Sequence, residues 1–550
     1  MKLDDYLCVH GAARFKKLIA NAKDFAGQDK IIVDPGDVRG IAEKSWQLIR
    51  EVNKKRLRFF FYANSLAVLD MEGKNDGQPI VILEKFKLRH KLIRLGEWCY
   101  FKGKKMRPYV HSIAALEDIL ADLDPSLPRL KGVAPMPLFA ADGTLATEPG
   151  YCVKTEFSYC PPANFSIPKI NSNPTAADLK NAKELILEEL LGNFPFVDKS
   201  DFSHAVGLLI LPFVRNLINE PTPLHLIEKS TPGTGATLLA QAISHVCTGK
   251  DFSVFPEGKD GDETRKRLTA VLYNAPWFLV LDNLNKVLDS PALAIVLTQT
   301  YWEDRILGQT KHVHIPVWCV WVATGNNPTL SHEIARRSLR IRLDAKRENP
   351  HLRDPSEFRH PGLLVWIKEN RSALVGAVLT LVQHWIASGR PKSKSEQSLG
   401  GFESWAAVIG GILDCAGIEG FLENTLDFYD DAQTENEQNK VFVAAWYREC
   451  KEDSVRASDL LAKPGISSLA YDIFEGTGDN RSSKTRLGFF IKKLKDKVFK
   501  FDDAIRSLTV VVRKSKKKIE NTTAWRLEVL EKRIRVIFKK REHGDVREVS

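Results

Sequence analysis

Short runs of apolar residues between positions 223 and 344 predict four buried strands. The runs are PLHLIEKS (223–230), WFLVLDN (277–283), PVWCVWVATGNN (316–327) and LRIRLD (339–344), and each ends on polar residues. A helical pattern, LLAQAISHVCTG (238–249), follows the first strand after a glycine-rich turn. Strands that alternate with helices form an open parallel sheet, and ligands bind at the carboxyl ends of its strands. The pattern therefore predicts an α/β core with a binding crevice at the polar strand ends.

The first 165 residues have a different pattern. RLRFFFYA (56–63) and PIVILE (79–84) are typical of strands, and HSIAALEDILADL (111–123) is typical of an amphipathic helix. The segment SIPKINSNPTAA (166–177), made mainly of small, polar and proline residues, is typical of a linker. We therefore expect residues 1–165 to form an α+β domain, acting as a collar or binding DNA, which the linker joins to an α/β core at 178–365.

The pattern after the core becomes helical and then mixed. Residues 366–435 include apolar helical stretches such as FESWAAVIGGILDCAG. The basic helical pattern RLGFFIKKLKDKVF (486–499) then precedes two strand patterns, SLTVVVRK (507–514) and TAWRLEVL (523–530). A helix followed by a hairpin, with basic residues on both, can grip a duplex backbone. We predict a winged-helix-like domain over 436–530 and a basic tail over 531–550.

Positive charge is concentrated at the same end of the chain. Residues 481–541 hold 21 Lys and Arg against 6 Asp and Glu, whereas the whole chain has a net charge of +11. The rest of the chain is therefore slightly acidic, and a polyanion is expected to contact the C-terminal end. A solvated, solubilising tail explains the last twenty or so residues equally well.

Composition argues against a membrane protein and against a disulfide scaffold. Hydrophobic residues make up 43% and charged residues 27% of the 550 positions, close to globular averages. No apolar run approaches the length that spans a bilayer, and the opening MKLDDYLCVHGAARF lacks the apolar core of a signal peptide. The eight cysteines are scattered without a CxxC pair, which favours buried thiols. We expect an intracellular, cytoplasmic protein of about three domains with no membrane partner.

The turn STPGTGAT (230–237) has the residues of a phosphate-binding loop except for its lysine. Backbone N–H groups of a glycine-rich turn that leads into a helix form a cradle for anions, and the hydroxyl that closes the turn ligates Mg²⁺. Thr237 has the position of that hydroxyl. We therefore expect ATP and Mg²⁺ as cofactors. The predicted ATP-binding residues are Pro232, Gly233, Thr234, Gly235, Ala236, Thr237 and Leu238.

Polar residues after the second and third strands complete the predicted site. Asp282 follows the apolar residues FLVL, where a carboxylate would hold the water shell of the metal, so Thr237 and Asp282 form the predicted metal site. Asn327 is expected to orient the attacking water or to sense the γ-phosphate. Arg336 and Arg337 are expected to reach the nucleotide of a neighbouring subunit. Each residue alone also fits a turn, a cap or a solvated helix face, but their order along the chain favours a nucleotide site.

Residues from about 178 to 365 resemble the AAA+ domain of superfamily 3 replicative helicases from phages, plasmids and mobile elements, which are often fused behind a primase. The matching segments are PTPLHLIEKSTPGTGAT, ETRKRLTAVL, LVLDN, LTQTYWEDRILGQT, VWVATGNN and IARRSLRIRLD. FESWAAVIGGIL, RLGFFIKKLKDKVF and AWRLEVL resemble the C-terminal parts of those proteins, and MPLFAADGTLATEPGYC resembles the segment that precedes their motor. The implied fold is an α/β AAA+ P-loop core with an N-terminal α+β domain, a helical region and a C-terminal winged helix.

This resemblance also implies partners. The family forms rings, usually hexamers, that draw one DNA strand through the centre, so single-stranded and forked DNA are expected partners, with a primase or a loader as a further one. The family contacts DNA through a hairpin just ahead of the third core strand, which here is ILGQTKHVHIPV. Lys311 and His312 lie at its expected tip, where a cation and a ring would meet backbone phosphates. An ordinary surface hairpin is the alternative.

The chain departs from the family pattern in the phosphate loop. The family has glycine-lysine-threonine where this chain has Gly235-Ala236-Thr237. That lysine bridges the β- and γ-phosphates, so alanine leaves weak nucleotide binding and is expected to reduce hydrolysis severely. Lys229 lies seven residues earlier and would have to fold back to replace it. The chain is either a natural relative without a working motor or the product of a deliberate lysine-to-alanine change. The intact Asn327 and paired arginines favour the second explanation.

A second departure is Asn283, where many AAA+ proteins have the glutamate that activates water. An amide cannot act as a general base. Glu263 in DETRKRL is a candidate for the missing carboxylate, and Glu303 in YWEDR is another. Both are also explained as solvated residues.

The leading hypothesis is therefore an ATP-dependent, ring-forming DNA helicase or translocase that replicates a mobile genetic element, with hydrolysis disabled at position 236. The alternative is a non-hydrolysing AAA+ scaffold or replication initiator that holds an origin while a partner does the work. A winged-helix transcription regulator explains the basic end but leaves the nucleotide residues without a purpose. The acidic pair Asp122 and Asp124 lies in a proline-bounded turn, so we predict no primase site.

Overall fold

The chain divides into two compact units, Met1–Leu426 and Asp427–Ser550. The computed structural model describes residues 30–70, 79–162, 164–255, 261–284, 287–305, 312–395, 397, 399–432, 434–473, 480–496, 498–503, 506–515, 519 and 522–534. The division falls inside the helical region predicted at 366–435. No helix within the described ranges combines the length and the apolar content that crossing a bilayer requires.

In its described residues, the N-terminal part of the first unit mixes short strands with three helices. Its elements are β1 (Ile31–Ile32), α2 (Val38–Lys55), β2 (Phe59–Tyr62), β3 (Ser65–Leu69), β4 (Ile80–Ile82), α3 (Lys85–Leu95), β5 (Trp98–Lys102), β6 (Lys105–Pro108) and α4 (Ile113–Ala121). The strands form two three-stranded sheets, of order β1-β5-β6 and β2-β3-β4. The strands predicted at 56–63 and 79–84 and the helix predicted at 111–123 are present as β2, β4 and α4.

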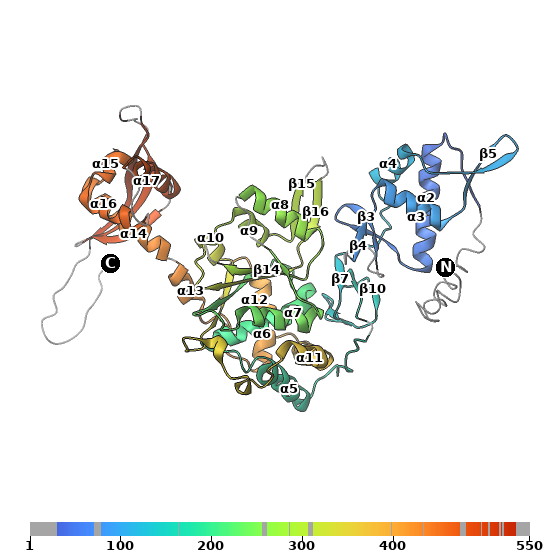
Figure 1. Ribbon diagram of the computed structural model, residues 1–550, viewed down its shortest axis with the longest axis horizontal. Helices are drawn as coiled ribbons and strands as arrows, with labels where there is room; N and C mark the ends of the chain where they lie inside the picture. The colour runs from blue at the N-terminus through green and yellow to red at the C-terminus, as the bar shows by residue number, and fades with distance from the viewer. Residues whose placement is uncertain are drawn as a thin grey trace. The chain divides into compact units, whose positions relative to one another are not determined.

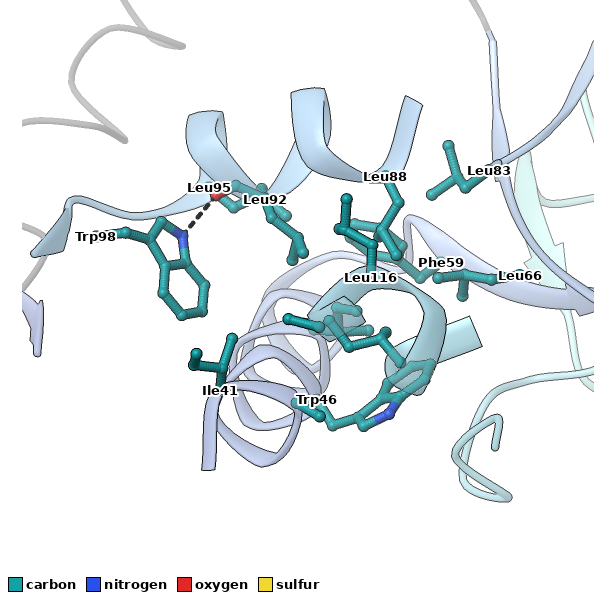
Figure 2. Packing of buried hydrophobic residues seen from close by; sticks show 14 of the residues in the cluster. Ile41, Trp46, Phe59, Leu66, Leu83, Leu88, Leu92, Leu95, Trp98 and Leu116 are labelled. Carbon is teal, nitrogen blue, oxygen red and sulfur yellow. Dashed lines mark hydrogen bonds between the residues drawn. The ribbon is translucent and has the colours of Figure 1, made fainter. Parts of the chain in front are cut away.

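Helices α2, α3 and α4 share one hydrophobic core. Leu88, Leu92 and Leu95 recur at i, i+4 and i+7 on α3, so they lie on one face of the helix, and all three are buried. Figure 2 shows this face directed toward α2 and α4, where Trp46 and Leu116 belong to the same cluster. The opposite face of α3 is left to solvent.

A small β module follows this part and contacts the start of the core sheet. It consists of β7 (Gly132–Ala134), β8 (Leu138–Phe139), β9 (Leu145–Ala146), β10 (Gly150–Cys152) and β11 (Phe157–Tyr159). The indole N–H of Trp277 donates to the Val133 carbonyl oxygen over 2.7 Å. The Phe157 ring lies 5.3 Å from the ring of Trp277 and 5.8 Å from that of Trp318, measured between centroids. These aromatic contacts hold the module against the residues that precede β14 and β17.

The core of the first unit is a five-stranded parallel sheet of order β13-β14-β17-β12-β18. Its strands are β12 (Leu224–Lys229), β13 (Ser253–Val254), β14 (Phe278–Leu284), β17 (Val320–Asn326) and β18 (Ser338–Leu343). The four strands predicted from apolar runs are present as β12, β14, β17 and β18. The fifth, β13, has two residues at the sheet edge, both exposed, and no apolar run marks it.

Helices cover both sides of this sheet (Figure 1). They are α5 (Ala176–Lys183), the π-helix η1 (Glu184–Leu190), α6 (Lys199–Val214), η2 (Arg215–Leu217), α7 (Ala236–Thr248), α8 (Gly261–Leu272), α9 (Pro291–Val296), α10 (His332–Ala335), η3 (Pro350–Leu352), η4 (Pro355–Glu357), α11 (Leu363–Ala387) and α12 (Glu403–Ala416). The antiparallel hairpin of β15 (Tyr301–Arg305) and β16 (His312–Pro316) precedes β17. The predicted core is therefore an α/β fold with a parallel sheet.

The segment predicted as a linker lies along α11. The Ser372 hydroxyl donates to the Ser166 carbonyl oxygen, and the Gln383 amide donates to the Ser172 carbonyl oxygen over 3.0 Å. A Cβ on Gly376 would lie 2.4 Å from Pro168 Cγ, so only glycine allows this approach. Thr175 then caps α5 in a capping box with Asp178.

One arginine joins three parts of the first unit. The guanidinium of Arg371, on α11, donates to the carbonyl oxygens of Val246 (3.0 Å) and Cys247 (2.7 Å) near the C-terminal end of α7. It also donates to the Pro135 carbonyl oxygen of the β module over 3.3 Å, and it lies 4.0 Å from the centroid of the Phe165 ring. A cation at a helix C-terminus is stabilised by the carbonyl groups there.

The second unit combines helices with an antiparallel sheet. Its elements are α13 (Thr425–Ala432), which begins just before the boundary, α14 (Thr434–Cys450), β19 (Val455–Arg456), α15 (Ala457–Leu461), α16 (Pro464–Ile473), α17 (Asn480–Leu494), β20 (Val498–Asp503), β21 (Arg506–Lys514) and β22 (Ala524–Ile534). The sheet order is β19-β22-β21-β20. The basic helix predicted at 486–499 ends earlier, because Val498 and Phe499 pair with Val511 and Val510 as the start of β20. The winged-helix fold stays a prediction.

Candidate functional site

Three adjacent strands bring predicted site residues to one edge of the core sheet. β17 lies between β12 and β14, and the three strands run parallel. Lys229 at the end of β12 pairs in register with Asn326 at the end of β17. Asp282 lies near the end of β14, beside Thr324 of β17. Because parallel strands end at the same edge, the loop after β12 and the polar ends of β14 and β17 lie together.

The loop between β12 and α7 has the backbone that its glycines allow. Gly233 and Gly235 adopt φ values of 86° and 108°, which L side chains rarely adopt. A Cβ on Gly233 would lie 2.9 Å from the Cβ of His351. Gly235 is the N-cap of α7, and no side chain caps the helix there. The first N–H groups of α7 are therefore available to an anion held by the loop.

Thr237 and Asp282 are in direct contact. The Thr237 hydroxyl donates to Asp282 Oδ1 over 3.0 Å, and the Thr324 hydroxyl donates to the same oxygen over 2.6 Å. Thr324 in turn accepts the Asn283 backbone N–H over 2.9 Å. The carboxylate is thus fixed between the first turn of α7 and the strand that separates β12 from β14.

The Thr237 and Asp282 pair fits Mg²⁺ bound together with a phosphate. Within the described ranges, no group of three or more His, Cys, Asp or Glu side chains could hold a metal on its own. Mg²⁺, however, usually keeps several waters and binds one or two carboxylates plus substrate phosphates. A hydroxyl and a carboxylate oxygen that face each other beside the glycine-rich loop would supply hard oxygen donors for such an ion.

Asn326, the last residue of β17, contacts the start of the loop through its side chain, and Asn327, the next residue, contacts Lys229 through its backbone. The Asn327 backbone N–H donates to the Lys229 carbonyl oxygen over 3.1 Å, and Asn327 has a φ of 43°. With its amide nitrogen turned toward the loop, Asn326 donates to the carbonyl oxygens of Lys229 and Ser230, both over 2.9 Å. Asn327, predicted as the sensor, is therefore placed at the site through its backbone, and Asn326 is a site residue that the sequence argument missed.

Residues from distant segments also support the loop, and the sequence argument missed them. The Ser230 hydroxyl donates to Asp344 Oδ1 over 2.9 Å, just after β18. Hydrogen bonds from the Lys346 backbone N–H and from Ser230 hold the pKa of Asp344 below its usual value. The Phe194 ring would lie 3.6 Å from a Cβ on Gly235. Asp344 was detectable, because it is the polar end of the fourth apolar run, whereas Phe194 and His351 carry no such signal.

The loop lacks a cation at position 236. Ala236 is the first residue of α7 and is 1% exposed. Lys229 lies in β12, between Asn326 and Leu343 of the neighbouring strands. In the described part of the chain, no lysine or arginine side chain donates a hydrogen bond to the segment from Ser230 to Thr237. Among the described residues, the structure therefore offers no direct replacement for the missing lysine.

The two predicted arginines lie together after α10. Arg336 and Arg337 both form ion pairs with Glu333 Oε2, at 2.8 Å and 2.7 Å. The hydrogen bond from Arg337 is the largest cause that lowers the pKa of Glu333. About half of the Arg336 side chain is exposed (51%), whereas Arg337 is 14% exposed. The ion pairs hold both guanidinium groups at Glu333 rather than at Thr237 and Asp282 of the same chain.

The candidate general bases have other partners. Glu263, on α8, pairs with Arg267 one turn later at 3.0 Å. Glu303, on β15, pairs with His314 of β16 at 2.8 Å. Asn283 adopts a φ of 57° at a register shift of β14. These contacts do not identify a base that would activate water.

The DNA hairpin was predicted within residues 306–317, of which 306–311 lie outside the described residues. The described remainder contains β16, which pairs with β15, a strand just ahead of the predicted segment. His312 begins β16, is exposed, and pairs with Arg305, the last residue of β15. Lys311 lies outside the described residues. The strand pairing thus places His312 at the end of the ladder next to the predicted tip.

No protein-family model matches this sequence, and no curated protein matches it. Among solved structures, the chain is similar to the apo C-terminal region of NrS-1, with 11% identity, a TM-score of 0.34, and coverage of 88% of this chain and 98% of that one. It is also similar to the SCCmec type IV Cch helicase, with 12% identity, a TM-score of 0.32 and coverage of 81% of both chains. For JCV helicase the values are 14% identity, a TM-score of 0.20, and coverage of 44% and 67%. Identities and TM-scores of this size identify neither a family nor a function.

Proposed function

We propose that this chain is an ATP-dependent, ring-forming DNA helicase or translocase of a mobile genetic element whose hydrolysis is disabled by alanine at position 236. The observation that carries the proposal is the 3.0 Å contact between Thr237 and Asp282, at the end of an anion-binding loop. The motifs that resemble superfamily 3 helicases are the reason for proposing DNA as the substrate. The excess of Lys and Arg over Asp and Glu in residues 481–541 of the sequence suits contact with a polyanion.

The residues at the carboxyl ends of the core strands have different roles in the proposed chemistry. The N–H groups of the loop and of the first turn of α7 bind the phosphates, and Thr237 and Asp282 orient Mg²⁺ beside them. Mg²⁺ would neutralise charge that develops on the phosphates during transfer. Asn326 and Asp344 hold the loop in place, and Asn327 remains the proposed sensor.

Alanine at position 236 is the proposed reason for a stalled motor. A lysine there would add a cation at the β- and γ-phosphates, where electrostatic stabilisation is usually the largest catalytic contribution. Nucleotide binding through backbone N–H groups needs no such cation. The proposed protein therefore binds ATP weakly and turns it over very slowly.

Restoring the cation tests this proposal. In the Ala236→Lys variant we expect ATP hydrolysis that DNA stimulates, together with strand displacement on a forked substrate. Ala236→Met is the matched control, because it adds similar length without charge and should stay inactive. If Ala236→Lys binds ATP and DNA as a folded protein but neither hydrolyses nor unwinds, the motor proposal is wrong.

Ring formation is part of the proposal, and the exposed arginine supports it. Arg336 is half exposed and could turn from Glu333 toward the nucleotide of an adjoining subunit. Sedimentation with ATP and Mg²⁺ should then show a closed oligomer, proposed to be a hexamer. In the Ala236→Lys background, Arg336→Ala should lose hydrolysis while it keeps nucleotide binding.

The alternative function is a non-hydrolysing scaffold or initiator that holds DNA while a partner works. Two observations favour it: Ala236 lacks the cation, and Asn283 is an amide where a base is expected. This function predicts that the protein assembles on DNA when ATP is present. It also predicts that the Ala236→Lys variant does not hydrolyse ATP. The same substitution therefore separates the two functions.

A further inference from the structure

The segment 85–107 is the most basic short stretch in the N-terminal part of the chain. It holds nine Lys and Arg against one acidic residue, Glu97. In the structure these residues form α3 and the antiparallel hairpin of β5 and β6. We call the hairpin of β5 and β6, without α3, the basic hairpin. Figure 1 shows the basic hairpin, marked by the label β5, extending beyond the helices α2, α3 and α4 of this part of the molecule.

The cations of the basic hairpin have no acidic partners among the residues that the structure describes. Every residue from 101 to 108 is exposed. Among the described residues, no carboxylate lies within ion-pair distance of Lys102, Lys104, Lys105 or Arg107. Lys102 and Lys105 are direct cross-strand partners, and like charges placed opposite each other destabilise a hairpin. A polyanion that lies against these residues would remove this repulsion.

The basic hairpin has two chemically different faces. Side chains alternate along a strand, so Lys102, Lys105 and Arg107 lie on one face. Phe101 and Met106 are cross-strand partners on the other face, and they are 52% and 39% exposed. A cationic face and a free aromatic ring, separated by the thickness of one hairpin, suit a ligand with both phosphates and accessible rings.

Helix α3 adds cations beside the start of this hairpin. Its buried face consists of leucines, and Lys87 and Lys91 lie one turn apart on the exposed side. The Trp98 indole N–H donates to the Leu92 carbonyl oxygen over 2.8 Å, as Figure 2 shows. This bond fixes the first residue of β5 against α3, so the hairpin projects from a rigid base.

We propose that the basic hairpin binds single-stranded nucleic acid, with Lys102, Lys105 and Arg107 on the phosphates and Phe101 stacked on an unpaired base. Stacking favours a single strand over a duplex, because the bases of a duplex are already stacked on one another. The proposal goes beyond the proposed motor, since it adds a contact that needs neither nucleotide nor the hairpin of β15 and β16.

Equilibrium binding of the full chain to labelled (dT)30 over a range of NaCl concentrations tests the proposal. The variant K102A/K105A/R107A should bind at least about tenfold more weakly at low salt, and the salt slope should fall by about 2, since each single-strand phosphate contact contributes about 0.7. The control K169A/K180A/K392A removes three other exposed cations and should match the unchanged chain. Equal affinities of the two triple variants would overturn the proposal.

The substitution Phe101→Ala tests the choice of a single strand. It leaves every charge in place, and we expect at least about fivefold weaker binding to (dT)30 with unchanged binding to a duplex. An equal loss on both substrates, or no loss, overturns the stacking contact. A parallel series with (U)30 decides whether the strand is DNA or RNA. Loss of binding to phosphatidylserine vesicles in the hairpin variant, with (dT)30 binding intact, would assign the surface to membranes and overturn the proposal.

The outcome is separable from that of the proposed motor. The proposed motor is tested by ATP hydrolysis and strand displacement in the Ala236→Lys variant. Position 236 is not part of the basic hairpin. A chain that hydrolyses ATP with lysine at 236 but shows no effect of the hairpin variant keeps the motor and loses this inference. Far-UV circular dichroism and the thermal midpoint of each variant check that folding is unchanged, as expected for exposed side chains.

Discussion

The Thr237 hydroxyl donates a 3.0 Å hydrogen bond to Asp282 Oδ1, although 45 positions separate the two residues in sequence. The hydroxyl of Thr324, on β17, donates to the same oxygen. The carboxylate is therefore held by two hydroxyls, one of which, that of Thr237, is also a proposed ligand of the metal. The dependence of nucleotide binding on Mg²⁺ is the property that these contacts should control.

Substitution of the carboxylate should remove that dependence. In Asp282→Asn, we expect a fluorescent ATP analogue to bind equally with Mg²⁺ and with EDTA, because the negative charge that attracts the ion is gone. Thr324→Val should weaken Mg²⁺-dependent binding by about tenfold, as loss of a supporting hydrogen bond to a ligand typically does. Asp118→Asn changes an exposed carboxylate on α4 and is the control. Retained Mg²⁺ dependence in Asp282→Asn would contradict the proposed metal site.

The glycine-rich loop between β12 and α7, proposed to bind phosphates, should not tolerate a side chain at position 233. Gly233→Ala combines a φ of 86° with a Cβ only 2.9 Å from the Cβ of His351, so we expect nucleotide binding to be lost. Gly389→Ala is a matched control, because Gly389 has a φ of 85° and no atom within 4 Å of the added Cβ. Both changes should cost about 1 kcal/mol of stability through backbone strain. Only the change at 233 should alter binding, and equal effects would disprove the close approach of His351.

Acid should weaken the first unit through a buried histidine. His204 Nδ1 donates to the Arg340 carbonyl oxygen, and Nε2 accepts the Leu422 backbone N–H. Burial lowers the pKa of His204 to about 4 from its ordinary 6.5. The contribution of neutral His204 to the free energy of unfolding is fully present above pH 6.5. It is lost as pH falls toward 4, by up to about 3 kcal/mol.

A comparison of variants isolates this effect. Burial raises the pKa of Asp201 to about 7. This group therefore stabilises the fold as pH falls from about 7 toward 4, which opposes the effect of His204. We therefore expect His204→Asn to be less stable at pH 7 but to lose less stability between pH 6.5 and 4 than the unchanged chain. His332→Asn changes an exposed histidine and should follow the unchanged chain. Parallel pH profiles for all three proteins, measured by calorimetry, would rule out His204 as the cause.

The tip of the β15 and β16 hairpin should matter for unwinding rather than for binding. In the Ala236→Lys background, we expect Lys311→Ala and His312→Ala to reduce strand displacement while duplex affinity stays within about twofold, since one lost phosphate contact has a small effect on a large basic surface. His332→Ala is the control. Unchanged unwinding in both hairpin variants would favour the ordinary surface hairpin.

The core strands were predictable because burial on both faces leaves a continuous apolar run. Such a run marks β12, β14, β17 and β18. The edge strand β13 was not predictable, because two exposed residues form no pattern. The end of the basic helix was misplaced because lysines continue past Leu494, and cross-strand pairing of Val498 ends the helical segment instead.

The candidate site was predictable to the extent that it lies within single segments. Glycine spacing located the loop, and strand ends located Asp282. The choice of Asn327 over Asn326 was not decidable from the sequence, since the two are adjacent and only the register with Lys229 separates them. His351 and Phe194 approach the loop from segments more than thirty residues away, a distance that no local pattern covers.

The position of Arg371 limits where the chain can be shortened. Its guanidinium is fixed by carbonyl oxygens of α7 and of Pro135, and its side chain is only 6% exposed. Truncation at residue 178 would strip away Pro135 and the Phe165 ring and open the surface of α11 that the preceding segment covers. Expression of the α/β core as a soluble piece should therefore succeed only when the starting point lies upstream of Gly132, so that the small β module is carried along.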